Sequence, residues 1–199
     1  MKRLAAVCLL LIAGCRTTRP DGTPFAPLAA TTAEEARSAL VDRAATFQGA
    51  RSMMRVRAIT PERTQSFRAQ LIIHDRQRME LVIYTPIGTT AATIRATGDQ
   101  IEFDSRVDAS SWRGTAEEVA RSFGFYGADL DPAETAMLLI GLPPRPDLPY
   151  EMTAAGIAGL TINDISVRFD PPAFPARRAA ISRGANRLEV EHMEVVASR

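Results

Sequence analysis

The sequence predicts an α+β domain with one mostly antiparallel β-sheet, one helix before it and two helices inserted within it. Apolar residues recur with a period of two from Arg51 onward, which is typical of strands with one buried face. The breaks between the first strand segments are short enough to join antiparallel neighbours. Three helix-start signals lie outside those segments. Because these helices are the available cover, the apolar face of the sheet must pack against them.

Residues 1–14 have the pattern of a signal peptide. Lys2 and Arg3 precede an apolar stretch that ends at Ile12, too short for a bilayer core that needs about 20 residues. The ending Ile12-Ala13-Gly14-Cys15 resembles the lipobox of bacterial lipoproteins, whose signal is cut before the cysteine. That resemblance implies a lipid on Cys15 and a domain outside the cytoplasm. An ordinary secretory signal with a chance cysteine is the alternative.

Residues 15–32 predict a solvated tether, because three prolines and Gly22 interrupt them. Thr32 and Glu35 then form a capping box, which starts a helix that continues to about Phe47. We assign residues 33–199 to the folded domain. Strands are predicted near 51–59, 65–74, 77–85, 89–97 and 100–105.

Two further helices are predicted after those strands. Thr115 and Glu118 form a second capping box, and Asp131, Pro132 and Glu134 form a third start signal. The remaining strands are predicted near 151–155, 161–169, 176–183 and 187–196. Trp112 precedes the second helix, and we interpret it as a packing residue.

Composition excludes several classes of function. After cleavage at Cys15 the chain has no lysine, so it lacks a Schiff-base or phosphate-loop lysine. Two histidines are too few for a three-histidine zinc site. The near-neutral charge argues against a nucleic-acid partner. With Cys8 in the signal, no disulfide framework is possible.

We expect no enzymatic activity, no metal and no cofactor, because no catalytic constellation is present. His74 and Asp75 are adjacent and would point to opposite faces of a strand. His192 is predicted to be a surface or cross-strand residue. The helices could leave an apolar hollow over the sheet, or they could fill an ordinary core, and the residues alone leave both possibilities open.

One hairpin tip is unusual, because Ile87 lies between Pro86 and Gly88. Proline and glycine favour a tight turn, whereas a β-branched residue gains little at a turn unless something buries it. Ile87 could fold back onto the core, or it could insert into lipid or a partner.

The sequence resembles the outer-membrane lipoprotein receptors of the lipoprotein-localisation system, the LolB family, over about residues 33–196. The segment from Met79 to Gly88 is similar to that family's strand and its Asn-Pro-Leu-Gly turn, with Thr85 and Ile87 as departures. The segment Leu139-Ile140-Gly141-Leu142-Pro143 is similar to the end of its inserted helix.

This resemblance implies an unclosed, strongly curved antiparallel half-barrel whose helices form a lid over an apolar cavity. It implies a protein anchored to the outer membrane at its periplasmic face, which takes lipoprotein acyl chains from a LolA-like carrier. It also makes Ile87 the residue that aids insertion of the cargo into the membrane. We expect a monomer. The predicted cavity residues are Met54, Val56, Leu71, Ile73, Met79, Leu81, Ile83, Ile94, Ile101 and Phe103 from the sheet, with Phe123, Met137 and Ile140 from the lid.

Two other functions remain open at this point. A lipid or glycolipid shuttle could use the same scaffold for another envelope component. A structural envelope lipoprotein with a filled core would bind no lipid.

Overall fold

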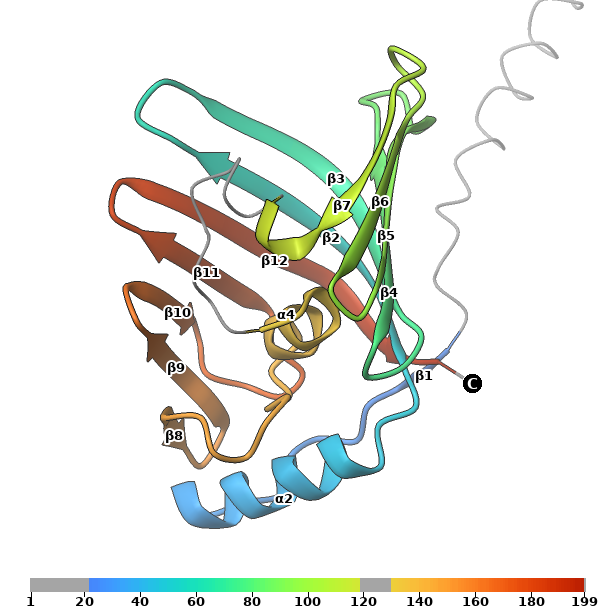
Figure 1. Cartoon of the computed structure of the whole chain (residues 1–199). Helices are drawn as coiled ribbons and strands as arrows, with labels where there is room; N and C mark the ends of the chain where they lie inside the picture. The colour runs from blue at the N-terminus through green and yellow to red at the C-terminus, as the bar shows by residue number, and fades with distance from the viewer. Residues whose placement is uncertain (1–21, 119–129, 199) are drawn as a thin grey trace, which may run out of the picture.

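A single 12-stranded antiparallel sheet forms most of the protein (Figure 1). The structure is a computed structural model that describes residues 22–118 and 130–198. The strand order is β7-β6-β5-β4-β3-β2-β12-β11-β10-β9-β8, with β1 paired to β12 outside this path. The strands are β1 (Thr23–Pro24), β2 (Ala50–Ile59), β3 (Thr64–Ile73), β4 (Arg78–Tyr84), β5 (Thr90–Thr97), β6 (Gln100–Ser105), β7 (Ser111–Thr115), β8 (Tyr150–Thr153), β9 (Gly156–Ile162), β10 (Ile165–Phe169), β11 (Arg178–Arg183) and β12 (Asn186–Ala197).

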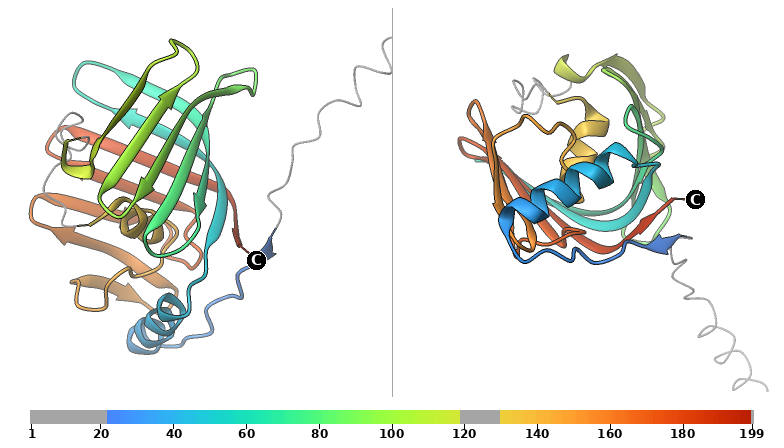
Figure 2. Two further views of the ribbon diagram at one scale, coloured as in Figure 1. Left: turned by 45° about the vertical axis from the view of Figure 1, so that its right-hand side comes forward. Right: turned by 90° about the horizontal axis from the view of Figure 1, so that it is seen from below.

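The sheet bends into an open half-barrel, as the family resemblance implies (Figure 2). The helix α4 (Pro132–Leu139) lies inside the curve, and α2 (Ala33–Ala45) crosses one end of it. We call the concave side that faces α4 the inner face and the opposite side the outer face. In the described part of the chain, no helix is long and apolar enough to cross a membrane.

The predicted helix starts are formed by the expected hydrogen bonds. The Glu35 amide donates to the Thr32 hydroxyl at α2 (3.1 Å), and the Glu134 amide donates to Asp131 at α4 (2.7 Å). The Thr115 amide donates to Glu118, and the Glu118 amide donates back to the Thr115 hydroxyl. At α4 the capping box is complete, because the Asp131 amide also donates to the Glu134 carboxylate, whereas at α2 the Glu35 carboxylate accepts from the Thr31 amide.

Two strand predictions are wrong. The expected strand over 161–169 is a hairpin, because the chain turns at Asn163, which adopts a positive φ of 54°. Asparagine tolerates this conformation better than most residues, and period-two patterning on both sides hides the break. The strand β7 was also not predicted: Trp112 does precede the helical residues 116–118, but it lies in β7, opposite Phe103.

The predicted tether is shorter than expected, because residues 23–28 pack on the domain. Thr23 pairs with Ala197, and Phe25 makes an edge-to-face contact with Phe174 at 5.3 Å between ring centroids. Arg43 of α2 donates hydrogen bonds to the carbonyl oxygens of residues 26 and 27. The proline content indicated a solvated segment, but the pairing of β1 with β12 and the contact between Phe25 and Phe174 fix part of this segment on the domain.

Candidate functional site

The inner face is mostly apolar, with Ser52 and His192 as buried polar residues on it. Residues directly opposite each other in an antiparallel pair share a face, so the register defines continuous rows. One row runs from β2 to β7 through Ser52, Leu71, Leu81, Ile94, Phe103 and Trp112. The next begins at Met54 and continues through Ala69, Ile83 and Ala92.

All ten sheet residues predicted to line a cavity lie on the inner face. Their burial differs with position. Met54, Val56, Leu71, Ile73 and Ile101 are buried, and Met79, Leu81, Ile83, Ile94 and Phe103 are partly exposed. Phe123 and Cys15 lie outside the described residues.

The helix α4 fills the middle of the half-barrel. Met137 and Ile140 have no solvent exposure, and Leu138 is equally enclosed. A helix that is apolar on all sides belongs inside a core, and α4 packs against β3, β4 and β5. Beneath α4 the inner face is therefore a packed core.

Both ends of α4 are held by polar contacts. The Arg145 guanidinium donates two hydrogen bonds of 2.8 Å to the Glu134 carboxylate, a bidentate pair near the first turn. At the last turn, His192 Nε2 donates to the carbonyl oxygen of Leu139 (3.1 Å). These contacts fix the position of α4 on the sheet.

His192 is buried. Of the two positions that the sequence left open, a surface residue and a cross-strand residue, the surface position is therefore wrong. His192 lies opposite Met54 on the inner face, beside a β-bulge in β12, and is 6% exposed. Because its Nε2 donates to a carbonyl, its Nδ1 accepts from the Ser52 hydroxyl at 2.7 Å. Burial lowers the pKa of His192 to about 4, since it penalises the charged imidazolium.

The Ser52–His192 pair has no access for a substrate. Ser52 is 1% exposed, and both imidazole nitrogens are already hydrogen-bonded. The described residues contain no cluster of histidine, cysteine and acidic side chains that could hold a metal ion. The site thus offers an apolar surface for binding.

A set of inner-face residues on β3 to β7 is only partly covered. We call this set the rim; its members are Phe67, Ile83, Ile94, Phe103 and Trp112, and Trp112 is 40% exposed. Ile94, Phe103 and Trp112 continue the apolar row beyond the residues that pack on the main core. An apolar chain could contact the rim without displacing α4.

The Ile87 side chain projects away from the core, so the possibility that it folds back is excluded. It is 87% exposed. The turn is set by hydrogen bonds from the Gly88 amide to the Thr85 carbonyl (2.9 Å) and from the Thr85 amide to the Thr89 carbonyl (2.8 Å). Gly88 has φ of +89°, a conformation that side chains disfavour.

A second exposed apolar residue, Val107, lies on the neighbouring hairpin between β6 and β7 and is 76% exposed. The meander brings the β4–β5 and β6–β7 hairpin tips to the same end of the sheet (Figure 1). Sequence reasoning missed Val107 because the strand β7 was not predicted, so no hairpin was expected there.

Comparison with known proteins identifies the fold. No protein-family model matches the sequence, and no curated protein matches it. Among solved structures, a Vibrio parahaemolyticus protein domain assigned to outer membrane lipoprotein sorting has a TM-score of 0.54 at 8% identity. The alignment covers 83% of this chain and 93% of that one. A DUF1329 family protein from Desulfovibrio piger gives the same four values.

A LolA superfamily protein from Nitrosomonas europaea is also similar, with a TM-score of 0.47 and 7% identity over 85% of this chain and 95% of that chain. At identities this low, the likeness describes the fold alone. The chain has the fold of lipoprotein-sorting domains, and its residues must carry any argument about function.

Proposed function

We propose that the protein is a membrane-anchored lipoprotein receptor that binds acyl chains on its inner face and inserts their lipoproteins into the outer membrane. The observation that carries the proposal is the continuous apolar inner face, which ends in the partly exposed rim. The fold shared with a lipoprotein-sorting domain supports it. The proposal requires binding and no catalysis.

The energetics explain why such a surface is needed. Exposing an acyl chain to water costs ~0.8 kcal/mol for each CH₂, so a sixteen-carbon chain costs on the order of 12 kcal/mol. A lipoprotein cannot cross an aqueous space at that cost. Carrier and receptor must each offer an apolar surface, and transfer requires the acyl chain to move from one surface to the other.

In this proposal Cys15 carries the lipid that holds the receptor at the periplasmic face of the outer membrane. A LolA-like periplasmic carrier delivers the cargo, and the receptor acts as a monomer. The exposed Ile87 contacts the bilayer during delivery, because burying an isoleucine side chain stabilises the contact by about 1.5–3 kcal/mol.

Transfer from a loaded carrier tests the proposal. Residues 16–199, which contain every described element, would be mixed with periplasmic carrier that holds labelled lipoprotein. We expect the label to move to this protein. Absence of transfer, with a carrier competent towards another receptor, would contradict the receptor function. Co-purification of a different lipid class would instead indicate a shuttle, and a protein that binds no lipid at all would be a structural lipoprotein.

A further inference from the structure

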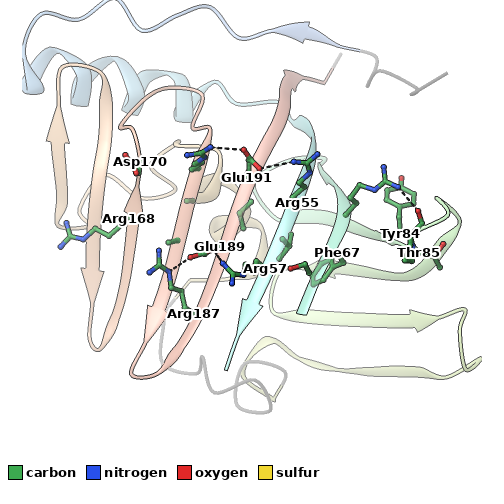
Figure 3. A pocket seen from close by; sticks show the side chains of 18 residues that line it. Arg55, Arg57, Phe67, Tyr84, Thr85, Arg168, Asp170, Arg187, Glu189 and Glu191 are labelled. Carbon is green, nitrogen blue, oxygen red and sulfur yellow. Dashed lines mark hydrogen bonds and ion pairs between the residues drawn. The ribbon is translucent and has the colours of Figure 1, made fainter. Parts of the chain in front are cut away.

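The outer face carries a groove that the acyl-binding function does not use. Its volume is about 770 Å³, and it crosses β10, β11, β12, β2 and β3 to the start of the Ile87 hairpin (Figure 3). Six arginines and three carboxylates line it, so positive charge is in excess. A second hollow of about 540 Å³ shares three of its residues, namely Arg55, Arg178 and Glu191.

Each glutamate in the groove is close to two arginines (Figure 3): those near Glu191 come from the neighbouring strands β2 and β11, and those near Glu189 come from β2 and from β12 itself. Glu191 is 3.8 Å from Arg55 and 3.4 Å from Arg178. Glu189 is 3.5 Å from Arg57 and 3.0 Å from Arg187. A guanidinium has five N–H donors, and most of these separations are too long to be strong hydrogen bonds. The glutamates therefore hold the arginines in place while donors stay available to an added anion.

Arg68 extends this positive surface toward the hairpin. Its Nη2 donates to the carbonyl oxygen of Pro86 at 3.2 Å, and among the described residues it has no carboxylate partner. Thr85 and Pro86 form the end wall of the groove, so Arg68 lies beside the hairpin that carries the exposed Ile87.

The part of the outer face formed by β4 to β7 has the opposite balance. On β4 to β7, three arginines form ion pairs with four carboxylates: Arg78 with Asp75, Arg95 with Glu80 and Asp104, and Arg113 with Glu102. The excess of arginine is thus a property of the groove and not of the whole face.

The anchor geometry favours contact between this face and a membrane. The hairpin that carries Ile87 lies at the end of the sheet where β12 begins, whereas β1 leaves the domain where β12 ends. From Arg187 to Ala197, β12 extends about 34 Å. The eight residues from Arg16 to Thr23 reach at most about 28 Å. If Cys15 and Ile87 contact one membrane, β12 must therefore tilt away from the membrane normal, which brings one face of the sheet closer to the bilayer.

We propose that the outer groove binds the phosphate headgroups of anionic lipids and so orients the domain on the membrane beside Ile87. Arginine is suited to this role, because its planar fork matches phosphate oxygens. This inference rests on the proposed function and adds the class of lipid that the receptor recognises at the membrane surface.

Vesicle binding without carrier or cargo tests the inference. Residues 16–199 would be sedimented with vesicles of phosphatidylcholine alone and with vesicles that also contain phosphatidylglycerol. We expect tighter binding to the anionic vesicles, and weaker binding as salt is added. The double variant Arg57→Gln/Arg68→Gln should weaken it about fivefold for each arginine removed.

The matched control is Arg95→Gln/Arg113→Gln, which removes two paired arginines of the same face outside the groove. It should bind anionic vesicles as the parent does, and thermal unfolding would verify that all variants are folded. Equal loss in both double variants, or equal binding to the two kinds of vesicle, would overturn the inference. Binding of soluble polyglutamate in place of vesicles would also overturn it and would indicate an acidic protein partner.

Failure here is distinguishable from failure of the receptor function. Cargo transfer from the carrier can succeed in a protein that does not discriminate between vesicles. Selective vesicle binding can likewise persist in a protein that accepts no cargo.

Discussion

Ile87→Glu is expected to abolish delivery of cargo into vesicles while cargo binding persists. The side chain is 87% exposed on a turn fixed by backbone hydrogen bonds, so the substitution should leave the fold unchanged. It removes about 1.5–3 kcal/mol of apolar burial and adds a charge that resists entry into lipid. We therefore expect delivery to fall at least tenfold, measured as label recovered in vesicles after transfer.

Ala185→Glu is the matched control, because it adds the same charge to the exposed β11–β12 tip at the same end of the sheet. It removes no large apolar side chain. Normal delivery by Ile87→Glu, or equal losses in both variants, would contradict a specific role for Ile87.

The buried His192 makes a second large effect accessible to measurement. In the unfolded chain its pKa is about 6.5, and burial lowers it to about 4 in the fold. Between these pH values the imidazole of His192 is protonated in the unfolded chain and neutral in the folded protein. The contribution of neutral His192 to the free energy of unfolding is therefore fully present above pH 6.5. As the pH falls toward 4, the free energy of unfolding decreases by about 3 kcal/mol.

Denaturant unfolding at a series of pH values measures this loss. His192→Gln should be less stable near neutral pH, because His192 links α4 to Ser52, but it should lose much less stability than the parent between pH 6.5 and 4. His74→Gln makes the same substitution at an exposed histidine and is the matched comparison. The three proteins contain the same carboxylates, so the contributions of these groups to the pH dependence of stability cancel in the comparison. An unchanged slope in His192→Gln would refute the linkage.

Local chemistry explains why most of the fold could be predicted from the sequence. Capping boxes at Thr32 and Asp131 satisfy backbone donors through residues three positions apart, and alternation marks one buried face in each strand. Both signals depend on neighbours in the chain, and the structure confirms the antiparallel sheet and the helix starts that they indicate, while the open curvature of the sheet was implied by the family resemblance.

The features that were missed depend on contacts between distant residues. Trp112 joins a strand because Phe103 lies opposite it, and Phe25 is ordered by Phe174. The contact between His192 and the end of α4 spans 53 positions in the sequence. The outer groove arises from arginines on separate strands, each one of which looks like an ordinary solvated residue in the sequence.

The filled centre of the half-barrel refines the candidate site. Met137 of α4 and Ile140 at its C-terminal end are fully buried within the half-barrel, and polar contacts at both ends of α4 hold the helix in place. An acyl chain that binds without moving α4 must therefore use the rim. The predicted wall residues divide accordingly into a structural set beneath α4 and a partly exposed set, of which Ile94 and Phe103 are members.

Mapping the position of a bound acyl chain tests the central claim most directly. A lipoprotein with a photoreactive group on its acyl chain would be transferred from carrier to this protein, irradiated and digested for peptide mass spectrometry. We expect adducts on inner-face residues of β3 to β6, with Ile83, Ile94 and Phe103 of the rim foremost. Adducts confined to the outer groove, or to the Ile87 hairpin alone, would contradict acyl binding on the inner face.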